Sequence, residues 1–181
     1  MDKRNILWPV VLVILFFIPL SGFADSGKFG LGLRTGLYKS NDASGLLLFG
    51  GAQVRWNAFP AMSLEATFDY RPEESYSNNR KITNFPVLMS ALFYPVPGAK
   101  ISPYVLGGVG WYYSKIEDGS GSSTWFTPGL HLGGGIDFPL NPYVVFNADI
   151  RYYFLRYNDD RVKDLNTDGF IISAGLTFYF W

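Results

Sequence analysis

Hydrophobic and polar positions alternate strictly along the last thirteen residues of the chain, from Gly169 to Trp181. One face of this segment carries only apolar residues: Phe170, Ile172, Ala174, Leu176, Phe178 and Phe180. The opposite face carries Ser173, Gly175, Thr177 and Tyr179. A period of two indicates a strand, because successive side chains of a strand point to opposite faces. A strand with one apolar and one polar face is typical of a barrel wall with lipid outside and a polar interior.

The same alternation recurs in seven earlier segments, so the sequence predicts eight strands. They cover residues 28–38, 45–57, 63–71, 82–94, 101–113, 125–138, 143–154 and 169–181. Each is about as long as the ~9–11 residues that a tilted strand needs to cross a bilayer.

The predicted connections alternate in length. Residues 58–62, 95–100 and 139–142 are short and contain proline, whereas residues 39–44, 72–81, 114–124 and 155–168 are polar and mostly longer. Short periplasmic turns and longer external loops are typical of a membrane barrel. We therefore predict an all-β fold, an eight-stranded antiparallel transmembrane up-and-down β-barrel. A soluble antiparallel sandwich is the alternative, but the inward faces are too polar for a dry core.

The start of the chain has the three regions of a secretory signal peptide. A short charged stretch at residues 2–5 is followed by an apolar run from Ile6 to Ile18 and by small residues before Ala24. We therefore expect cleavage after Ala24, with residues 1–24 removed and residues 25–181 forming one barrel domain. The alternative is a retained membrane anchor, but the run is shorter than the ~20 residues of a spanning helix.

Composition removes several classes of function. The chain has no cysteine, so disulfides, thiolate chemistry and a lipidated cysteine anchor are excluded. Without residues 1–24, 13 basic residues stand against 14 acidic ones, a balance that gives no electrostatic reason to bind nucleic acid. Aromatic residues make up 18% of the chain, which suits the interfacial girdles of a membrane barrel.

The signal peptide, the eight strands, the segment Tyr104–Trp111 and the terminal Gly175–Phe180 together resemble the small outer-membrane β-barrel proteins of OmpA/OmpX type, a porin-family barrel domain. The resemblance covers essentially all of the mature chain. It implies a monomer in the outer membrane of a Gram-negative cell envelope, surrounded by outer-membrane lipids and lipopolysaccharide. It also implies that the barrel-insertion machinery reads the C-terminal strand, through either Phe180 or Trp181. No cofactor is expected.

Polar residues predicted to point inward form the main candidate site. They are Arg34, Gln53, Arg55, Glu65, Thr67, Asp69, Arg71, His131, Asp137, Asn147, Asp149 and Arg151. An eight-stranded barrel is just wide enough for its own side chains to fill it. Because acidic and basic groups are about balanced, we expect them to pair and to plug the barrel. The alternative is a narrow porin-like pore for ions or very small solutes, whose selectivity these charges would set.

The single histidine raises a second alternative, a lipid-modifying outer-membrane enzyme. His131 and Asp149 are predicted at similar depth on adjacent strands, so they are expected to approach one another. Ser173 lies one strand further on, an arrangement that does not promise the hydrogen-bond reach that a Ser–His pair needs. The His-x-Ser arrangement of the related lipid A deacylases is also missing, because the chain reads His131-Leu132-Gly133. We therefore expect a structural histidine and no enzymatic activity.

The external loops hold the remaining candidates. Asp164, Asn166 and Asp168 have the spacing of a calcium loop, but Gly175 stands where such a loop has its bidentate glutamate. Residues 73–80 and 115–123 are polar, and loops on a rigid scaffold are where recognition usually resides. The expected function is therefore non-enzymatic, either membrane-structural or a surface interaction with a ligand through the external loops.

Two aromatic girdles are expected to anchor the wall at the membrane interfaces. The first comprises Tyr70, Tyr112, Tyr113, Trp125, Tyr152 and Phe154. The second comprises Trp56, Phe59, Phe93, Tyr94, Tyr104, Phe138, Tyr143 and Phe178.

Overall fold

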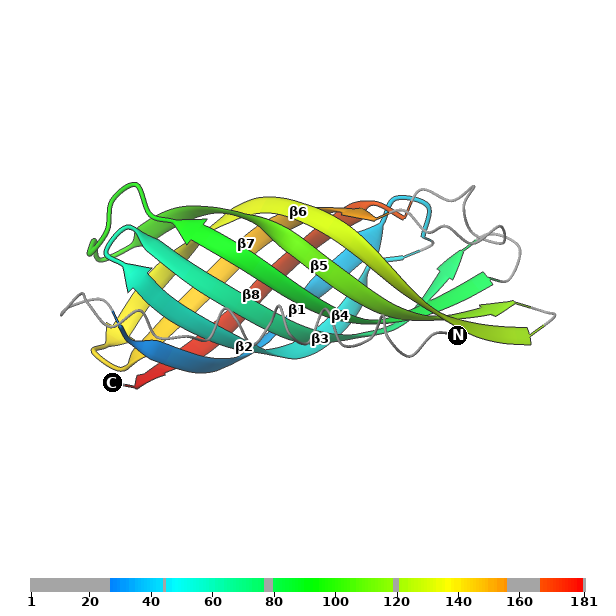
Figure 1. Cartoon of the computed structure of the whole chain (residues 1–181), viewed down its shortest axis with the longest axis horizontal. Coiled ribbons are helices and arrows are strands. Elements are labelled where there is room, and N and C mark those ends of the chain that lie inside the picture. The colour runs from blue at the N-terminus through cyan, green and yellow to red at the C-terminus, as the bar shows by residue number, and fades with distance from the viewer. Residues whose placement is uncertain (1–26, 44, 77–79, 119–120, 156–166, 181) are drawn as a thin grey trace, which may run out of the picture.

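The chain forms a single closed barrel of eight strands (Figure 1). A computed structural model describes residues 27–43, 45–76, 80–118, 121–155 and 167–180. The strands are β1 (Phe29–Ser40), β2 (Leu47–Phe59), β3 (Met62–Tyr76), β4 (Arg80–Phe93), β5 (Ser102–Asp118), β6 (Gly121–Asn141), β7 (Val144–Leu155) and β8 (Gly169–Phe180). The predicted signal peptide lies outside the described residues. No helix in the described ranges is long and apolar enough to cross a bilayer.

Every strand pairs antiparallel with its neighbour in sequence, and β8 closes the barrel against β1. Phe29 stands opposite Phe180, so β1 begins where β8 ends. We call this the turn end, because the short connections between β2 and β3, β4 and β5, and β6 and β7 lie there. The opposite end is called the loop end. The predicted fold, an eight-stranded antiparallel up-and-down barrel, is confirmed.

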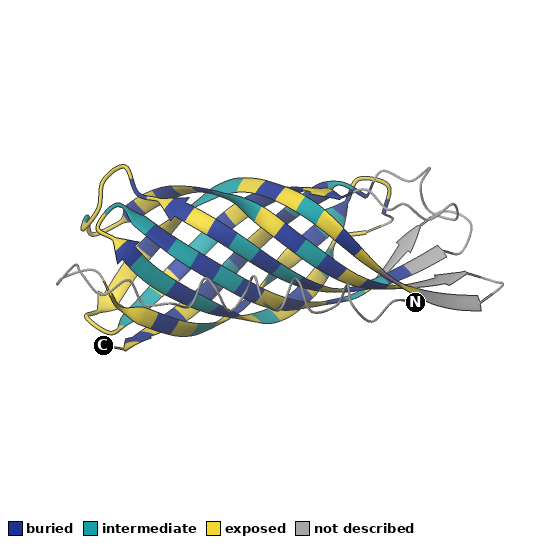
Figure 2. Ribbon diagram, in the orientation of Figure 1, coloured by how far each residue is buried: buried dark blue, intermediate teal, exposed yellow. Residues whose placement is uncertain are grey.

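Burial alternates along every strand and gives the wall a chequered pattern (Figure 2). On the outer face, Leu33 is 73% exposed and Leu48 is 65% exposed. The alternate residues of each strand point into the interior and are buried, as Arg34 is with 4% exposure. Large apolar side chains thus cover the outside, as a wall that faces hydrocarbon requires.

The strands reach further at the loop end than the sequence predicted. Residues 72–81 and 114–124 were expected to be loops, but β3 continues to Tyr76, β4 begins at Arg80, and β5 and β6 remain paired from Ser114–Trp125 to Asp118–Gly121. The hydrophobic alternation does not report these extensions, because a strand beyond the bilayer has water on both faces. These extensions are held together by the backbone hydrogen bonds between the paired strands.

Two apolar clusters lie in the interior. The turn-end cluster consists of Leu92, Tyr94, Tyr104 and Leu106. The loop-end cluster consists of Tyr38, Ala43, Phe49, Ile82, Leu88, Tyr112, Tyr153, Leu155 and Ile171. Polar side chains fill the space between them.

Three tyrosines assigned to the girdles lie inside the barrel instead. Tyr94, Tyr104 and Tyr112 are 8%, 3% and 0% exposed. Along β5 the outward residues are odd-numbered, as Val105 shows with 56% exposure, so Tyr104 and Tyr112 have to point inward. The prediction treated all aromatics near strand ends as interfacial and was wrong for these three.

Candidate functional site in the barrel interior

The interior holds four arginines and four carboxylates, all buried in the described part of the chain. The arginines are Arg34, Arg55, Arg71 and Arg151, and the carboxylates are Glu65, Asp69, Asp137 and Asp149. The neutral residues that the sequence placed inward, Gln53, Thr67, His131 and Asn147, are buried as well. Their distances show which of them interact.

Arg55 links the two sides of the barrel near the turn end. Its Nη2 and Nε donate to Glu65 Oε2 at 2.6 and 3.1 Å, and its Nη1 donates to both oxygens of Asp137 at 2.9 and 2.8 Å. Tyr94 adds a third contact, because its hydroxyl donates to Asp137 Oδ2 at 2.8 Å. Charge-assisted bonds of this length are among the strong ones in proteins.

Arg151 continues the same network toward the middle of the barrel. Its Nη2 donates to Glu65 Oε1 at 2.8 Å, so the Glu65 carboxylate bridges Arg55 and Arg151. Arg151 also forms a bidentate pair with Asp149, through Nε at 2.8 Å and Nη2 at 2.8 Å. The result is a continuous chain of alternating charge, in which each buried group has an opposite partner, as buried charges require.

The chain passes from Asp149 to Arg34 through a serine. Ser173 Oγ donates to Asp149 Oδ1 at 2.9 Å, and Arg34 Nη2 donates to Ser173 Oγ at 2.8 Å. Arg34 Nη2 also lies 4.0 Å from Asp149 Oδ1. Ser173 is therefore a bridge between two charged groups.

Toward the loop end the pairing is looser. Asp69 lies 3.6 Å from Arg34 Nε and 3.8 Å from Arg71 Nη2, and neither of its carboxylate oxygens forms a hydrogen bond within the described residues. The guanidinium carbon of Arg71 lies over three tyrosine rings, those of Tyr38, Tyr112 and Tyr153, at 5.6, 5.4 and 5.1 Å from their centroids. Cation–π contact thus stabilises Arg71 where carboxylate contact is weak.

Inward-facing glycines let side chains meet across a strand. Gly32 on β1 is opposite both Gln53 on β2 and Thr177 on β8, and Gln53 Nε2 donates to Thr177 Oγ1 at 2.6 Å. Gly51 on β2 stands in the same way between Arg34 and Asp69. An ideal Cβ on Gly51 would lie 2.3 Å from Asp69 Oδ1, so any side chain there would displace the carboxylate.

His131 contacts a serine and not the expected carboxylate. In the register of β6 and β7, His131 stands opposite Tyr153, whereas Asp149 stands opposite Gly135. The His131 Nε2 atom lies 2.8 Å from Ser90 Oγ on β4. The expected approach of His131 to Asp149 is not observed. The depth of a residue in the barrel depends on the register between strands, and two residues at similar distances from their strand ends need not be neighbours.

A serine within hydrogen-bond reach of His131 is the contact that a lipid-modifying enzyme would need, but the Ser90–His131 pair lacks the rest of a catalytic triad. His131 Nδ1 has no hydrogen-bond partner within the described residues, so no carboxylate orients the imidazole. Ser90 Oγ also accepts a hydrogen bond from Arg151 Nη1 at 3.3 Å. Both residues are buried, at 5% and 1% exposure. Ser90 was missed because only the apolar face of its strand was considered.

The calcium candidate is only partly within the structure. Asp164 and Asn166 lie outside the described residues. Asp168 Oδ1 accepts a hydrogen bond from the backbone N–H of Leu155 at 2.7 Å, so one of its oxygens serves the strand end. Within the described ranges, no group of three histidine or acidic side chains is placed to hold a metal ion.

The comparisons with known proteins agree with this architecture. Residues 10–178 match the family model of the outer membrane protein beta-barrel domain. None of the curated proteins matches the sequence.

Solved structures share the fold at low sequence identity. Neisserial surface protein A superposes with a TM-score of 0.66 at 16% identity, over 86% of this chain and 98% of that one. The N-terminal barrel of Pseudomonas aeruginosa OprF gives 0.61 at 10% identity, over 83% and 97%. Ail, the attachment invasion locus protein of Yersinia pestis, in complex with the heparin analogue sucrose octasulfate, gives 0.56 at 17% identity, over 86% and 99%.

Proposed function

The chain belongs to the outer membrane protein beta-barrel domain family, and from this premise we propose that it is a closed, non-enzymatic barrel that acts by presenting its loop end at the cell surface. Export by a cleaved signal peptide, residues 1–24, and a monomeric state belong to the same proposal. The outer membrane is the location that the family implies, with the loop end facing outward.

The pairing of the interior charges carries the proposal. Arg55 and Arg151 are completely buried and share the Glu65 carboxylate at 2.6 and 2.8 Å. A conducting lumen would need these groups to face water, whereas here they face one another. The turn-end and loop-end clusters then cover the charged layer from both sides. This pairing supports a structural role for the interior charges, and the proposal therefore places the function at the surface.

The loop end offers more than loops. β3 and β6 both continue past the residues at which β2 and β7 stop pairing with them, which are Tyr70 and Gly129. The extensions of β3, β4, β5 and β6 form a four-stranded sheet that projects from the barrel (Figure 1). Among the described residues, no strand pairs with its outer edges, and exposed strand edges are templates for extended peptides. Similar structures with the names surface protein and attachment invasion locus protein support a surface role.

The test has two parts. First, the folded mature barrel is placed in a planar bilayer, wild type beside Arg34→Ala, and current is recorded. We expect no discrete openings from the wild type. Openings whose ion selectivity changes with Arg34→Ala would replace this proposal with the narrow pore.

Second, the projecting sheet is shortened. In one variant, residues 75–81 and 116–123 are each replaced by a two-residue Asn-Gly turn, which keeps the paired positions Glu74–Ile82 and Lys115–Thr124, and surface density is matched to wild type. Cells that carry each form are then measured for adhesion to immobilised heparin, because the similar structure of Ail holds a heparin analogue. Loss of adhesion in the shortened form supports the proposal. Equal adhesion by both forms and by cells without the barrel leaves the membrane-structural role.

The narrow pore is the second candidate, and one observation favours it. Several buried polar atoms near mid-height form no hydrogen bond within the described residues, including Arg34 Nη1, Thr67 Oγ1 and His131 Nδ1. Buried polar atoms without protein partners commonly mark the positions of internal water. The bilayer recording decides between a hydrated but closed interior and a conduit.

A further inference from the structure

The projecting sheet has two outer edges, one on β3 and one on β6, and the two are built differently. On β6, pairing with β7 stops at Gly129, whereas pairing with β5 continues to Gly121. Among the described residues, the stretch 121–128 is therefore paired on one side only. Figure 1 shows this part of β6 running on beyond the end of β7.

Two hydrogen bonds at the end of β7 fix the direction of the main-chain groups where this stretch begins. The N–H of Leu155 donates to Asp168 Oδ1 at 2.7 Å, and the carbonyl of Leu155 accepts from Thr167 Oγ1. Both groups of Leu155 therefore point toward β8. Gly129 stands opposite Leu155, and in an antiparallel pair of this kind the groups of both residues point away from each other. The N–H and C=O of Gly129 thus point toward β5.

The alternation along β6 then places three complete sets of main-chain groups on the side away from β5. The β5–β6 register has no shift, so every second residue before Gly129 points away from the ladder. These residues are Phe126, Thr124 and Ser122, and we call their outward N–H and C=O groups the β6 edge. Pro128 agrees with this assignment, because proline is tolerated where its missing N–H would face away from the ladder.

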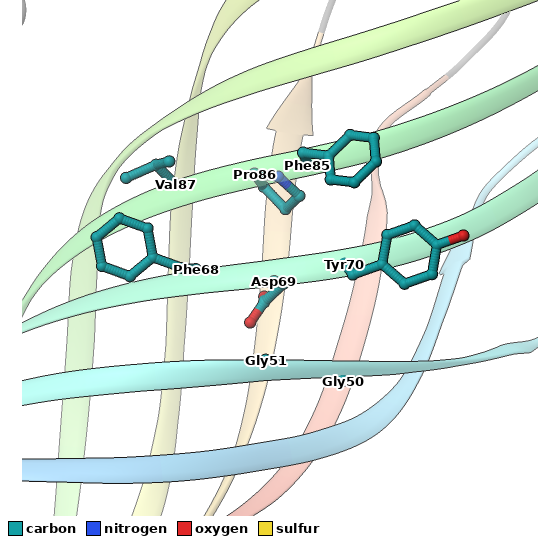
Figure 3. Close-up of a pocket in the computed structure, with 8 residues that line it drawn as sticks. All are labelled: Gly50, Gly51, Phe68, Asp69, Tyr70, Phe85, Pro86 and Val87. Atoms are coloured by element: carbon teal, nitrogen blue, oxygen red, sulfur yellow. The ribbon is translucent and has the colours of Figure 1, made fainter.

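The edge on β3 has features that keep strand edges from pairing, and the β6 edge lacks them. The β3 edge includes Pro72 and Glu73, and the register with β4 shifts between Arg71 and Glu74. Figure 3 shows Pro86 of β4 near the base of this edge, where the β3–β4 ladder is also interrupted. Proline, charge and bulges are the usual means of protecting an edge. Residues 121–127 contain no charged residue and no proline, and their register with β5 is regular.

We propose that the β6 edge binds an extended, uncharged segment of another protein, which adds to the projecting sheet as a further strand. Main-chain donors and acceptors that recur at every second residue match those of another extended main chain. Residues 121–129 offer no charge to a charged side chain opposite them, so an uncharged segment fits best. The side chains of Thr124 and Phe126 are exposed and favour β-branched or aromatic neighbours in the added strand. The inference rests on the surface role proposed above and names its partner.

A second copy of the chain in the same membrane does not fit the β6 edge. Two copies that present the same end outward are related by a two-fold axis along the membrane normal, which brings the same surface of each copy together. Each N–H of the edge would then face the identical N–H of the other copy. The hydrogen bonds between parallel strands are slanted and join different residues, so this arrangement forms no ladder.

The test removes one edge donor at a time. Thr124→Pro and Ser122→Pro each delete an N–H that points away from β5, so neither variant loses a ladder hydrogen bond within the barrel. Thr124→Val and Ser122→Ala are the matched controls, because they keep the N–H. Folding of each variant is checked by its heat-dependent shift in gel electrophoresis.

The probe is a fluorescein-labelled peptide of three Thr-Val repeats between terminal lysines. It is added to the folded barrel in detergent micelles, and binding is followed by fluorescence polarisation. The same peptide with every central N–H methylated is the control probe, because it has the same side chains but cannot donate to a strand edge.

Wild type, Thr124→Val and Ser122→Ala are expected to bind the peptide and not its methylated form. Thr124→Pro and Ser122→Pro are expected to bind it about tenfold more weakly, because a proline ring replaces a hydrogen-bond donor. Equal binding by all five proteins, or no binding by wild type, would overturn the proposal. Binding that appears only after residues 156–166 are replaced by an Asn-Gly turn would assign the edge to the chain's own segment. A dimer that Thr124→Pro dissociates would assign it to a second copy, and either result also overturns the proposal.

The adhesion test of the surface role is separate from this one. Adhesion that is lost when the sheet is shortened, together with equal peptide binding by all variants, would leave the surface role standing and remove this partner. Peptide binding that depends on Thr124, without any change in adhesion on shortening, would support the partner and not the role in adhesion.

Discussion

His131 Nε2 and Ser90 Oγ lie 2.8 Å apart although a whole strand separates them. The residue between them on β5 is Gly108, which stands opposite Ser90 on one side and His131 on the other. Because Gly108 has no side chain, the two polar groups meet over its backbone. Hydrogen bonds formed across an inward-facing glycine are thus a recurrent feature of this interior.

Replacing Ser90 by alanine is expected to change stability and not lipid chemistry. The change leaves His131 Nε2 without its partner, and an unsatisfied buried group costs about 1–3 kcal/mol. Unfolding in urea from lipid vesicles measures this cost. The lipid A mass spectrum of cells that carry Ser90→Ala is expected to equal that of wild type and of a deletion strain. A lipid A species that is present only with the wild-type gene would instead support enzymatic activity.

Two adjacent glycines are expected to respond oppositely to alanine. At Gly51 an ideal Cβ lies 2.3 Å from Asp69 Oδ1 and 2.6 Å from the carbonyl oxygen of Phe68, whereas at Gly50 it meets no atom within 4 Å. Overpacking of this kind costs about 1–3 kcal/mol, so Gly51→Ala should destabilise the barrel and Gly50→Ala should not. The free energies of unfolding of the two variants are compared directly. Equal values would mean that the interior is not packed as described.

Neutralising Glu65 is expected to be the most damaging change among the interior charges. Glu65→Gln removes the negative charge that lies between Arg55 and Arg151. Breaking a buried ion pair costs about 3–5 kcal/mol. The exposed Glu73→Gln is the control, because a surface ion pair is worth about 0–1 kcal/mol. If Glu65→Gln unfolds no more easily than Glu73→Gln, the network does not stabilise the barrel.

A charge placed on the outer wall is expected to cost free energy according to its depth. Ile150, 55% exposed, lies in the middle of β7, and Ile150→Arg should cost about 2–4 kcal/mol in a bilayer. Tyr143, 59% exposed, lies at the turn between β6 and β7, and Tyr143→Arg should cost about 0–1 kcal/mol. Folding yield into vesicles reports both values. A reversed order would contradict the assignment of the outer face.

The sequence by itself determined the alternation, and with it the strands, their order and the inner or outer face of most residues. Side-chain direction in a strand depends only on parity, that is, on whether the residue number is odd or even. Parity is a local property, which is why Arg34 and Leu33 were assigned to opposite faces without a structure. Parity was not applied to Tyr104 and Tyr112, although it would have placed them inside. The extensions of β5 and β6 left no such signal, because both of their faces lie outside the hydrocarbon.

Only the tertiary structure decided which interior groups meet. Arg55 on β2 reaches Asp137 on β6, four strands away, and this contact depends on the closure of the barrel and not on any spacing in the sequence. The register between strands likewise separates His131 from Asp149. Register is the alignment of residues between two paired strands, so the sequence of one strand does not determine it. The physical reason is that a face is fixed by one strand, whereas a contact is fixed by how eight strands are staggered around a closed ring.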